Sequence, residues 1–264
     1  MSATTLLHVE GLTKYFGGVS ALVDYSIDIE PGELIGLIGP NGAGKTTVFN
    51  LLSGVLKPSN GRVVFNEHDI TRLRPDQNVA LGIARTFQNI RLFNDLSVTE
   101  NIKVAFHMHL GAGFWRTLFS TPGFRRAEQI MEQQVEEFLD LLDLKNVKDE
   151  LAQNLPYGVQ RRVEIARAMA TAPRLLLLDE PAAGMNANET QELIRIIHDI
   201  HQRYSLTIFL VEHDMKLVMA LCQRIQVIDR GRTLIVGTPP EIRSHPEVIN
   251  AYLGKPKGTL HAAY

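Results

Sequence analysis

A nine-residue stretch, GPNGAGKTT, has the residue types and spacing that bind nucleotide phosphates. It matches the pattern G-x-x-x-x-G-K-[ST], directly after an apolar run and at the start of a helical pattern. The glycines let backbone N–H groups turn inward, the lysine reaches the β- and γ-phosphates, and the first threonine ligates Mg²⁺. The predicted nucleotide-binding residues are Gly39, Pro40, Asn41, Gly42, Ala43, Gly44, Lys45, Thr46 and Thr47, with Lys45 also catalytic and Thr46 also a metal ligand. An ordinary glycine turn is the alternative, and the flanking strand and helix patterns disfavour it.

Two carboxylates follow another apolar run. In RLLLLDEP, Asp179 and Glu180 come at the carboxyl end of a predicted buried strand, where open α/β sheets bind ligands. Asp179 is predicted to hold Mg²⁺ in its outer shell. Glu180 is predicted to polarise the attacking water, a role worth about 10² to 10⁴ in rate. Alone, such a pair is more often an acidic helix start, but beside a phosphate loop it indicates nucleotide hydrolysis.

Three further side chains have both a chemical and a structural interpretation. His213 follows the apolar run LTIFLVE and could donate a hydrogen bond to a γ-phosphate, or it could be a satisfied structural histidine. Gln88 follows a short strand pattern, and its amide could touch Mg²⁺ and water; a plain surface glutamine is the alternative. Phe16 could lie flat against adenine or pack under a sheet, and Tyr15 is a rival for the same task.

The stretch NLPYGVQRRVEIARAM places a proline, a tyrosine and a glycine at a helix start. The N–H groups of a first helical turn have no intrahelical partner, and the macrodipole is positive at this end. This helix start is therefore a ready place for an anion, which raises the question whether a phosphate docks there.

Hydrophobic periodicity predicts the scaffold that must position these groups. LLHVEGL and ALVDYSIDIEPGE alternate with period two, which is typical of antiparallel strands with one buried face. ELIGLIG, RLLLLDEP and LTIFLVEHD are continuous apolar runs, which are typical of strands covered on both faces of a parallel sheet. GKTTVFNLLSG, closed by a C-cap glycine, and NETQELIRIIHDIHQRY have helical spacing. The alternation of strand and helix predicts an α/β core.

Helical patterns replace the strand patterns between Asn89 and Asn154. SVTENIKVAFHMHL opens with Ser97 and Glu100 in capping-box spacing. RRAEQIMEQQVEEFLDLLDL is amphipathic, and its apolar positions include Ile130, Phe138, Leu141 and Leu142. We expect a helical subdomain inserted in the α/β core, and two short helices in GTPPEIRSHPEVINAYLG.

The composition argues against several functional classes. With 27 basic and 29 acidic side chains in 264 residues, the chain has no basic excess with which to bind nucleic acid by charge. Cys222 is the only cysteine, so an internal disulfide or a redox pair is excluded, and a buried inert thiol is expected. MSATTLLHVEGL lacks the pattern of a signal peptide, and no apolar run approaches the roughly 18 residues of a membrane span. We expect the chain in the cytoplasm or on the cytoplasmic face of a membrane.

As an ordered set, these residues resemble the ATP-binding subunits of ABC transporters over nearly the whole chain. The set comprises Phe16, Gly39–Thr47, Gln88, LPYGVQRR, LLLLDEP, AGMN and His213. Within that superfamily, RTFQNIRLFNDLSVTENI, YGVQRRVEIARA, LDEPAAGMN, VEHDMKLVM and VINAYLG resemble the LivG-type subunit of branched-chain amino acid importers. The resemblance implies a single P-loop ATPase domain: an α/β core with an antiparallel β subdomain from 1–88 and 165–240, a helical subdomain at 89–164, and a C-terminal helical tail at 241–264.

The resemblance also gives a role to the helix start after Asn154. In this family two chains face each other, and each ATP is held between the phosphate loop of one and a helix N-terminus of the other, usually marked Leu-Ser-Gly-Gly-Gln. The residues in register with that motif are Leu155, Gly158 and Gln160, whereas its serine, first glycine and final glutamine are replaced by Pro156, Tyr157 and Val159. The resemblance implies that Tyr157, Gly158 and Gln160 contact the nucleotide of the partner chain.

A related departure lies in AGMN, where Asn186 occupies a position that is usually aspartate. The groups that act on this chain's own nucleotide look complete, while two groups lent to the partner are altered. This leads to the hypothesis of an unequal pair of ATP sites. Restoring serine, glycine and glutamine at 156, 157 and 159 would then raise the ATPase rate of the assembled complex. The alternative is that backbone donors suffice and neither site is impaired.

The resemblance implies ATP and Mg²⁺ as cofactors, and hydrolysis that energises uptake of branched-chain or related hydrophobic amino acids. Transmembrane permease subunits and a second ABC ATPase are the implied partners; that second chain is identical or, in keeping with the altered motifs, related. An extracytoplasmic solute-binding protein is implied indirectly, nucleic acid is not, and the chain would be peripheral on the cytoplasmic face of the inner membrane. The loop that begins at Gln88 and the helical insertion would transmit motion to the permease.

Two other functional classes fit the sequence less well. A cytosolic ABC ATPase acting on nucleic acid or ribosomes usually has a long coiled-coil insertion or a second ATPase repeat, and neither pattern is visible. A small-molecule P-loop kinase has no need for LPYGVQRR or His213. The aromatic and arginine cluster GAGFWRTLFSTPGF either touches the permease or lipid headgroups, or folds on its own subdomain.

Overall fold

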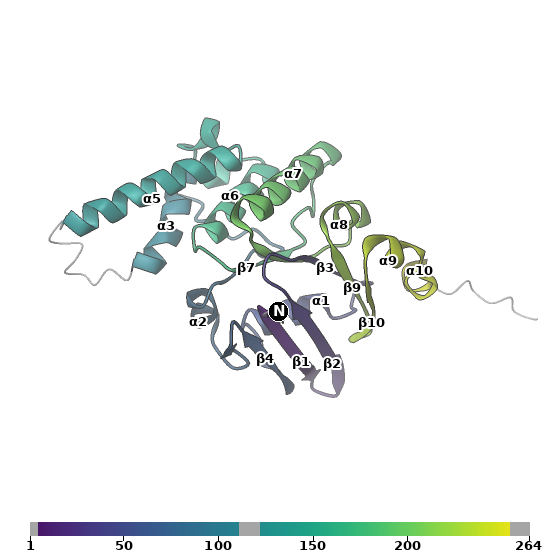
Figure 1. Cartoon of the computed structure of the whole chain (residues 1–264). Coiled ribbons are helices and arrows are strands. Elements are labelled where there is room, and N and C mark those ends of the chain that lie inside the picture. Colours follow the sequence, from purple (N-terminus) through teal and green to yellow (C-terminus); the bar gives the residue numbers. More distant parts are fainter. Residues whose placement is uncertain (1–4, 111–121, 254–264) are drawn as a thin grey trace, which may run out of the picture. The chain divides into compact units, whose positions relative to one another are not determined.

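The computed structural model of the chain describes residues 5–110 and 122–253, which form two compact units (Figure 1). The first unit combines Met1–Glu30, Leu34–Arg72 and Val211–Tyr264, and the second combines Pro31–Glu33 and Leu73–Leu210. The side chains of the predicted cluster at 111–124, and the end of the predicted tail at 254–264, lie outside what the structure describes. The subdomain bounds expected from the family stay a prediction.

An antiparallel sheet opens the first unit. Its strands, in the order β2-β1-β4-β5, are β1 (Leu7–Phe16), β2 (Val19–Ile29), β4 (Asn60–Phe65) and β5 (His68–Asp69). Leu7 is paired with both Ile29 and Phe65, and all three side chains are buried. The period-two alternation therefore predicted this sheet correctly, because alternate residues of a strand face the same side.

The first unit also holds three strands in the order β10-β9-β3. They are β3 (Leu34–Ile38), β9 (Arg224–Asp229) and β10 (Arg232–Gly237); β3 is parallel to β9, and β10 is antiparallel to it. Its helices are α1 (Lys45–Leu52), α8 (Met215–Leu221), α9 (Pro239–Ser244) and α10 (Pro246–Leu253). Cys222 follows α8, where burial raises the pKa of its thiol, as expected for an inert cysteine.

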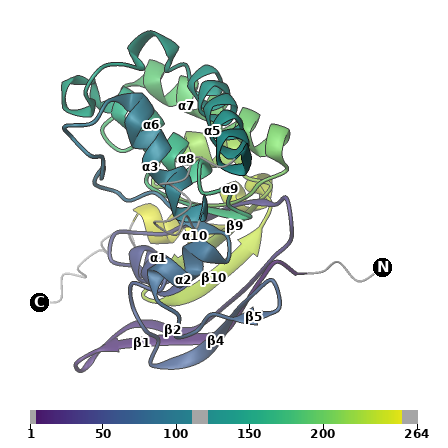
Figure 2. The same ribbon diagram turned by 90° about the vertical axis from the view of Figure 1, so that its left-hand side faces the viewer.

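The second unit contributes three more strands, in the order β8-β7-β6. They are β6 (Ile83–Arg85), β7 (Leu175–Asp179) and β8 (Thr207–Val211), of which β6 and β7 are parallel. Its helices are α2 (Pro75–Ala80), α3 (Val98–Leu110), α5 (Pro122–Leu141), α6 (Tyr157–Met169) and α7 (Ala187–Tyr204), with short 3₁₀ turns at Lys145–Val147 and Ala152–Asn154. In both views α3, α5, α6 and α7 gather together (Figure 2).

Local helix signals in the second unit largely hold. Ser97 and Glu100 exchange the two bonds of a capping box, at 2.8 and 3.2 Å, as predicted. The apolar stripe of α5 differs in one position: Ile130 is 49% exposed, while its neighbour is buried. The buried positions on α5 are Met131, Val135, Phe138 and Leu139; Leu141 is half-buried, and Leu142, directly after the helix, is buried. Because helical neighbours three and four residues apart share a face, this stripe begins one residue later than the sequence indicated.

Together these elements confirm the predicted α/β class. Every residue of β3, β7 and β8 is buried, which explains why their sequences are continuous apolar runs. Among the residues described, no helix is both long enough and apolar enough to span a bilayer.

Candidate nucleotide-binding and hydrolysis site

The phosphate loop, Gly39–Thr47, runs from the end of β3 into the first turn of α1. Its backbone path needs glycine at two points. A Cβ atom on Gly39 would lie 2.2 Å from the carbonyl oxygen of Ile228, and one on Gly44 would lie 2.8 Å from that of Ala21. Gly44 also has a φ of 107°, in the left-handed region that other residues avoid. The loop therefore has the close-packed, side-chain-free turn that the motif predicted.

Lys45 places its ammonium group against the loop itself. The side chain is buried, and Nζ donates to the carbonyl oxygens of Gly39 at 2.6 Å and Pro40 at 3.1 Å. Thr46 and Thr47 follow in the first turn of α1, which contains no acidic residue. A helix start without a carboxylate, beside a buried cation, suits an anion such as a phosphate.

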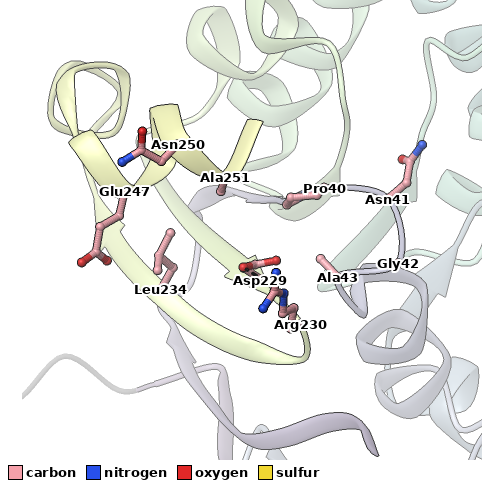
Figure 3. Close-up of a pocket in the computed structure, with 10 residues that line it drawn as sticks. All are labelled: Pro40, Asn41, Gly42, Ala43, Asp229, Arg230, Leu234, Glu247, Asn250 and Ala251. Atoms are coloured by element: carbon pink, nitrogen blue, oxygen red, sulfur yellow. Dashed lines mark ion pairs between the residues drawn. The ribbon is translucent and has the colours of Figure 1, made fainter. Parts of the chain in front are cut away.

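A pocket of about 760 Å³ borders the phosphate loop (Figure 3). Its lining comprises Pro40, Asn41, Gly42, Ala43, Asp229, Arg230, Leu234, Glu247, Asn250 and Ala251. Neither Lys45 nor Thr46 lines it. The pocket therefore lies beside the loop and is not the cradle in which Lys45 would meet a phosphate.

Phe16 and His213 are the other predicted site residues of the first unit. Phe16 ends β1 with 47% of its surface exposed, so it is not fully buried beneath the sheet, and its contact with adenine stays a prediction. Tyr15 is 48% exposed, so exposure does not decide which of the two rings would lie against adenine. His213 has a side chain that is 58% exposed, and the preceding Glu212 is fully buried and accepts from the His213 N–H at 3.0 Å. Sequence reasoning missed Glu212, although an acid that ends an apolar run is a usable signal.

The two predicted carboxylates lie in the second unit with different environments. Asp179, at the end of β7, is ion-paired with Arg85 at 2.7 Å, and both side chains are at least 94% buried. Glu180 has a φ of 46° and accepts from Nε2 of Gln88 at 3.0 Å. A left-handed glutamate is strained, and such residues cluster at functional sites. The structure thus brings Gln88 and Glu180 together, and it adds Arg85, which sequence reasoning missed because no motif marks it.

The predicted metal ligands, Thr46, Gln88 and Asp179, fit Mg²⁺ only when phosphate oxygens complete its coordination. Among the described residues, no group of three or more His, Cys, Asp or Glu side chains could hold a metal ion. Hydroxyl, amide and carboxylate oxygens are nevertheless the hard ligands that Mg²⁺ takes beside nucleotide phosphates. One oxygen of Asp179 is engaged by Arg85, which agrees with an outer-shell role. Thr46 belongs to the first unit, and Gln88 and Asp179 to the second, so their joint metal site stays a prediction.

The predicted docking helix, α6, begins at Tyr157 with Pro156 as its N-cap. No side chain caps this end, so the first N–H groups keep their capacity for an anion. Gly158 is buried, and a Cβ atom there would lie 3.1 Å from Oε1 of Glu189. Gln160 donates from its amide to the carbonyl of Leu155 at 2.9 Å. The nucleotide contacts predicted for Tyr157, Gly158 and Gln160 stay predictions.

Asn186 has a local structural role at the start of α7. Its side chain accepts from the N–H groups of Asn188 at 2.9 Å and Glu189 at 3.1 Å. In return, the N–H of Asn186 donates to the Glu189 carboxylate. Aspartate fills the N-cap position equally well. The cap therefore explains a short polar side chain at 186, and does not by itself explain the amide.

Two family models match parts of the chain, and several known proteins resemble almost all of it. Residues 22–183 match the family model described as ABC transporter, and residues 236–257 match the model described as branched-chain amino acid ATP-binding cassette transporter. The chain is 46% identical to the high-affinity branched-chain amino acid transport ATP-binding protein LivG of Salmonella typhimurium (strain LT2), over 95% of this chain and 98% of that protein. It is 44% identical to BraF of Pseudomonas aeruginosa (strain PAO1), a protein of the same description, over the same shares.

A solved structure agrees with these sequence relatives. The ADP conformation of MJ1267, an ATP-binding cassette of an ABC transporter, superposes with a TM-score of 0.80 at 29% identity, covering 96% of this chain and 100% of that one. An α/β core with a glycine-rich phosphate loop defines a P-loop nucleotide hydrolase. More narrowly, the chain belongs to the ABC transporter family, in which it is an ATP-binding subunit and an ATPase. The predicted family and enzyme class are confirmed.

Proposed function

We propose that this chain energises the uptake of branched-chain or related hydrophobic amino acids through separate membrane permease subunits. The observation that carries the proposal is 46% identity to LivG over 95% of the chain. The C-terminal match at 236–257 adds support, because that segment lies outside the part matched by the general ABC transporter model.

The chemistry of the site follows from its residues. The N–H groups of the phosphate loop and the ammonium of Lys45 would bind and orient the triphosphate. Mg²⁺, held by Thr46, Gln88 and Asp179, would neutralise phosphate charge. Glu180 would orient the attacking water and take its proton, and His213 would donate a hydrogen bond to the γ-phosphate. Phe16 would stack on the adenine ring.

A second ATPase chain would complete each site with the start of its own α6. Binding of two ATP molecules would close the pair and hydrolysis would let it open, a population shift set by the γ-phosphate contacts. The altered residues at 156, 157, 159 and 186 support a related rather than an identical second chain. An external solute-binding protein would act through the permease, with this chain on the cytoplasmic face of the membrane.

A groove in the second unit supports docking of a permease segment beside the Gln88 loop. It has a volume of about 370 Å³ and includes Arg85, Phe87, Arg91, Phe93 and Arg167 in its lining. The Arg91 guanidinium lies 4.2 Å from the centre of the Phe87 ring, and that of Arg167 lies 4.9 Å from the Phe93 ring. Stacked arginine and aromatic side chains are common anchors of protein interfaces. Movement of the Gln88 loop would thus be transmitted to a permease segment bound in this groove.

Uptake of labelled leucine tests the proposal directly. The whole transporter would be expressed in cells that lack other leucine importers, with the wild-type chain, the Lys45→Ala variant or the Lys57→Ala variant. Lys57→Ala is the control, because Lys57 is an exposed lysine of the same unit. We expect uptake to fall to background only with Lys45→Ala. Uptake that is insensitive to Lys45→Ala would contradict the role in transport. Co-purification of the chain only with nucleic acid or ribosomes, and never with detergent-solubilised membrane proteins, would instead favour a cytosolic ABC ATPase.

A further inference from the structure

Arg161 is the largest fully buried side chain in the described part of the protein, and it lies in the second turn of α6. A guanidinium ion removed from water is very unfavourable unless it is paired and hydrogen-bonded. The four partners that it finds show what this residue does.

Two of those partners are backbone carbonyls of the segment that follows β6. Nη1 of Arg161 donates to the Phe87 carbonyl at 2.6 Å, and Nη2 donates to the Gln88 carbonyl at 2.7 Å. The rigid guanidinium fork therefore holds two successive peptide groups at once. Glu164 completes the clamp, because it accepts from Nη1 at 2.6 Å and from the Phe87 N–H at 3.2 Å.

The segment held in this way carries Gln88, which together with Glu180 we call the hydrolytic pair. The side chain of Gln88 donates to Oε2 of Glu180 at 3.0 Å. A shift of the Gln88 backbone would therefore move the amide away from the carboxylate.

Tyr157, the first residue of α6, is the fourth partner of the clamp. Its hydroxyl oxygen accepts from Nη2 of Arg161 at 3.0 Å. Its ring also lies against the loop that follows Glu180, since a Cβ atom on Gly184 would be 3.5 Å from Cε1 of the tyrosine. A glycine at position 157, as the family motif usually has, could make neither contact.

We propose that Tyr157 and Arg161 are positioning residues that link the start of α6 to Gln88 and to the loop after Glu180. The start of α6 is where the nucleotide of the second chain would dock, so the link would couple that nucleotide to this chain's own hydrolytic pair. This inference rests on the proposed roles of Gln88 and Glu180. It gives Tyr157 a function different from, and additional to, direct contact with nucleotide.

Tyr157→Phe is the sharpest test, because it removes one acceptor and keeps the ring against Gly184. Tyr204→Phe is its matched control: Tyr204 lies in the same unit, is 36% exposed against 41% for Tyr157, and its hydroxyl donates to Glu137 at 2.6 Å. In the assembled transporter, we expect Tyr157→Phe to lower kcat for ATP hydrolysis about 10-fold, the size of one hydrogen bond to a charged group. We expect KM for ATP to change by less than about 2-fold, since no ground-state contact of this chain's own nucleotide is removed.

A double-mutant cycle separates positioning from a merely structural effect. In a Gln88→Ala background, Tyr157→Phe should have no further effect on kcat, because the group that it positions is gone. Arg161→Lys should resemble Tyr157→Phe, since an ammonium group cannot hold two carbonyls and a hydroxyl in one plane. The proposal would be overturned if the fold-losses of kcat for Gln88→Ala and Tyr157→Phe multiplied fully in the double variant. It would also be overturned if Tyr204→Phe lowered kcat as much as Tyr157→Phe does.

Glu180→Gln distinguishes this inference from the proposed function. If Glu180→Gln leaves hydrolysis intact, the assigned hydrolytic pair is wrong and the positioning role falls with it. If Glu180→Gln abolishes hydrolysis while Tyr157→Phe retains the wild-type kcat, the positioning role alone is refuted.

Discussion

At the scale of single residues, two acids at adjacent positions have opposite environments. Asp179 is buried against Arg85, whereas Glu180, directly after β7, has a left-handed backbone, accepts from Gln88 and is partly exposed. A general base must reach water, and a charge-neutralising ligand need not. The two carboxylates therefore have different surroundings, and the division of labour between them stays a prediction.

We predict that Glu180→Gln lowers the rate of ATP hydrolysis by about 10² to 10⁴, the usual contribution of a positioned general base. Affinity for the nucleotide should be unchanged, because the phosphates are bound by the phosphate loop. Single-turnover hydrolysis and titration calorimetry would measure the two effects, with Glu192→Gln on α7 as the control. A Glu180→Gln chain that hydrolyses ATP within 10-fold of the wild-type rate would place the base elsewhere.

At the scale of elements, helix starts determine where phosphate and protein groups can meet. The start of α6 has no side-chain cap, whereas the start of α7 is closed by Asn186 and Glu189. An uncapped end keeps donors for an anion, while a capped end contributes stability. The two helix starts therefore differ in capping, and their roles at the dimer interface stay predictions.

Asn186→Ala should lower the free energy of unfolding by about 1 kcal/mol, because two N–H groups lose their acceptor. Asn186→Asp should preserve stability, since a carboxylate accepts the same bonds. Urea unfolding of the isolated chain would measure both variants. In the assembled complex, a higher ATPase rate of Asn186→Asp at unchanged stability supports the unequal pair of sites. An unchanged rate favours the alternative that the existing groups suffice.

At the scale of the whole molecule, each compact unit carries part of the predicted nucleotide site. The phosphate loop and His213 belong to the first unit, and Gln88, Asp179 and Glu180 belong to the second. A ligand that binds only the folded chain stabilises it by an amount set by its concentration relative to Kd. Nucleotide binding should therefore be visible as thermal stabilisation.

We expect Mg²⁺ with ATP at about 100 times Kd to raise the Tm by about 5 to 10 °C, from a linkage term of about 2.7 kcal/mol. Lys45→Ala should lose most of this shift, and Lys57→Ala should keep it. Differential scanning calorimetry would measure the shift, and omission of Mg²⁺ would show the contribution of the metal. A Lys45→Ala chain stabilised as strongly as wild type would refute the role of the phosphate loop.

Much of the fold and of the predicted site follows from local sequence. Strands leave continuous or periodic apolar patterns, and the phosphate loop has a fixed residue spacing. Continuous apolar runs identified β3, β7 and β8, and the glycine spacing identified the phosphate loop, whose crowding at Gly39 no other residue tolerates. Ile130 was less informative, since an apolar residue at the edge of a helical stripe can face either core or solvent. Arg85 belongs to no motif, so only its contacts reveal it, whereas Glu212 ends an apolar run and could have been found from the sequence.

The amino-acid sequence by itself determined the α/β class, the phosphate loop, the carboxylate pair and the family, because each depends on residues close together in the chain. Only the tertiary structure decided that Arg161 holds the carbonyls of Phe87 and Gln88, and that Gln88 reaches Glu180. These partners are separated by 73 to 92 positions in the chain. Contacts over such distances depend on how the helices and strands pack, and no local pattern of residue types encodes that packing.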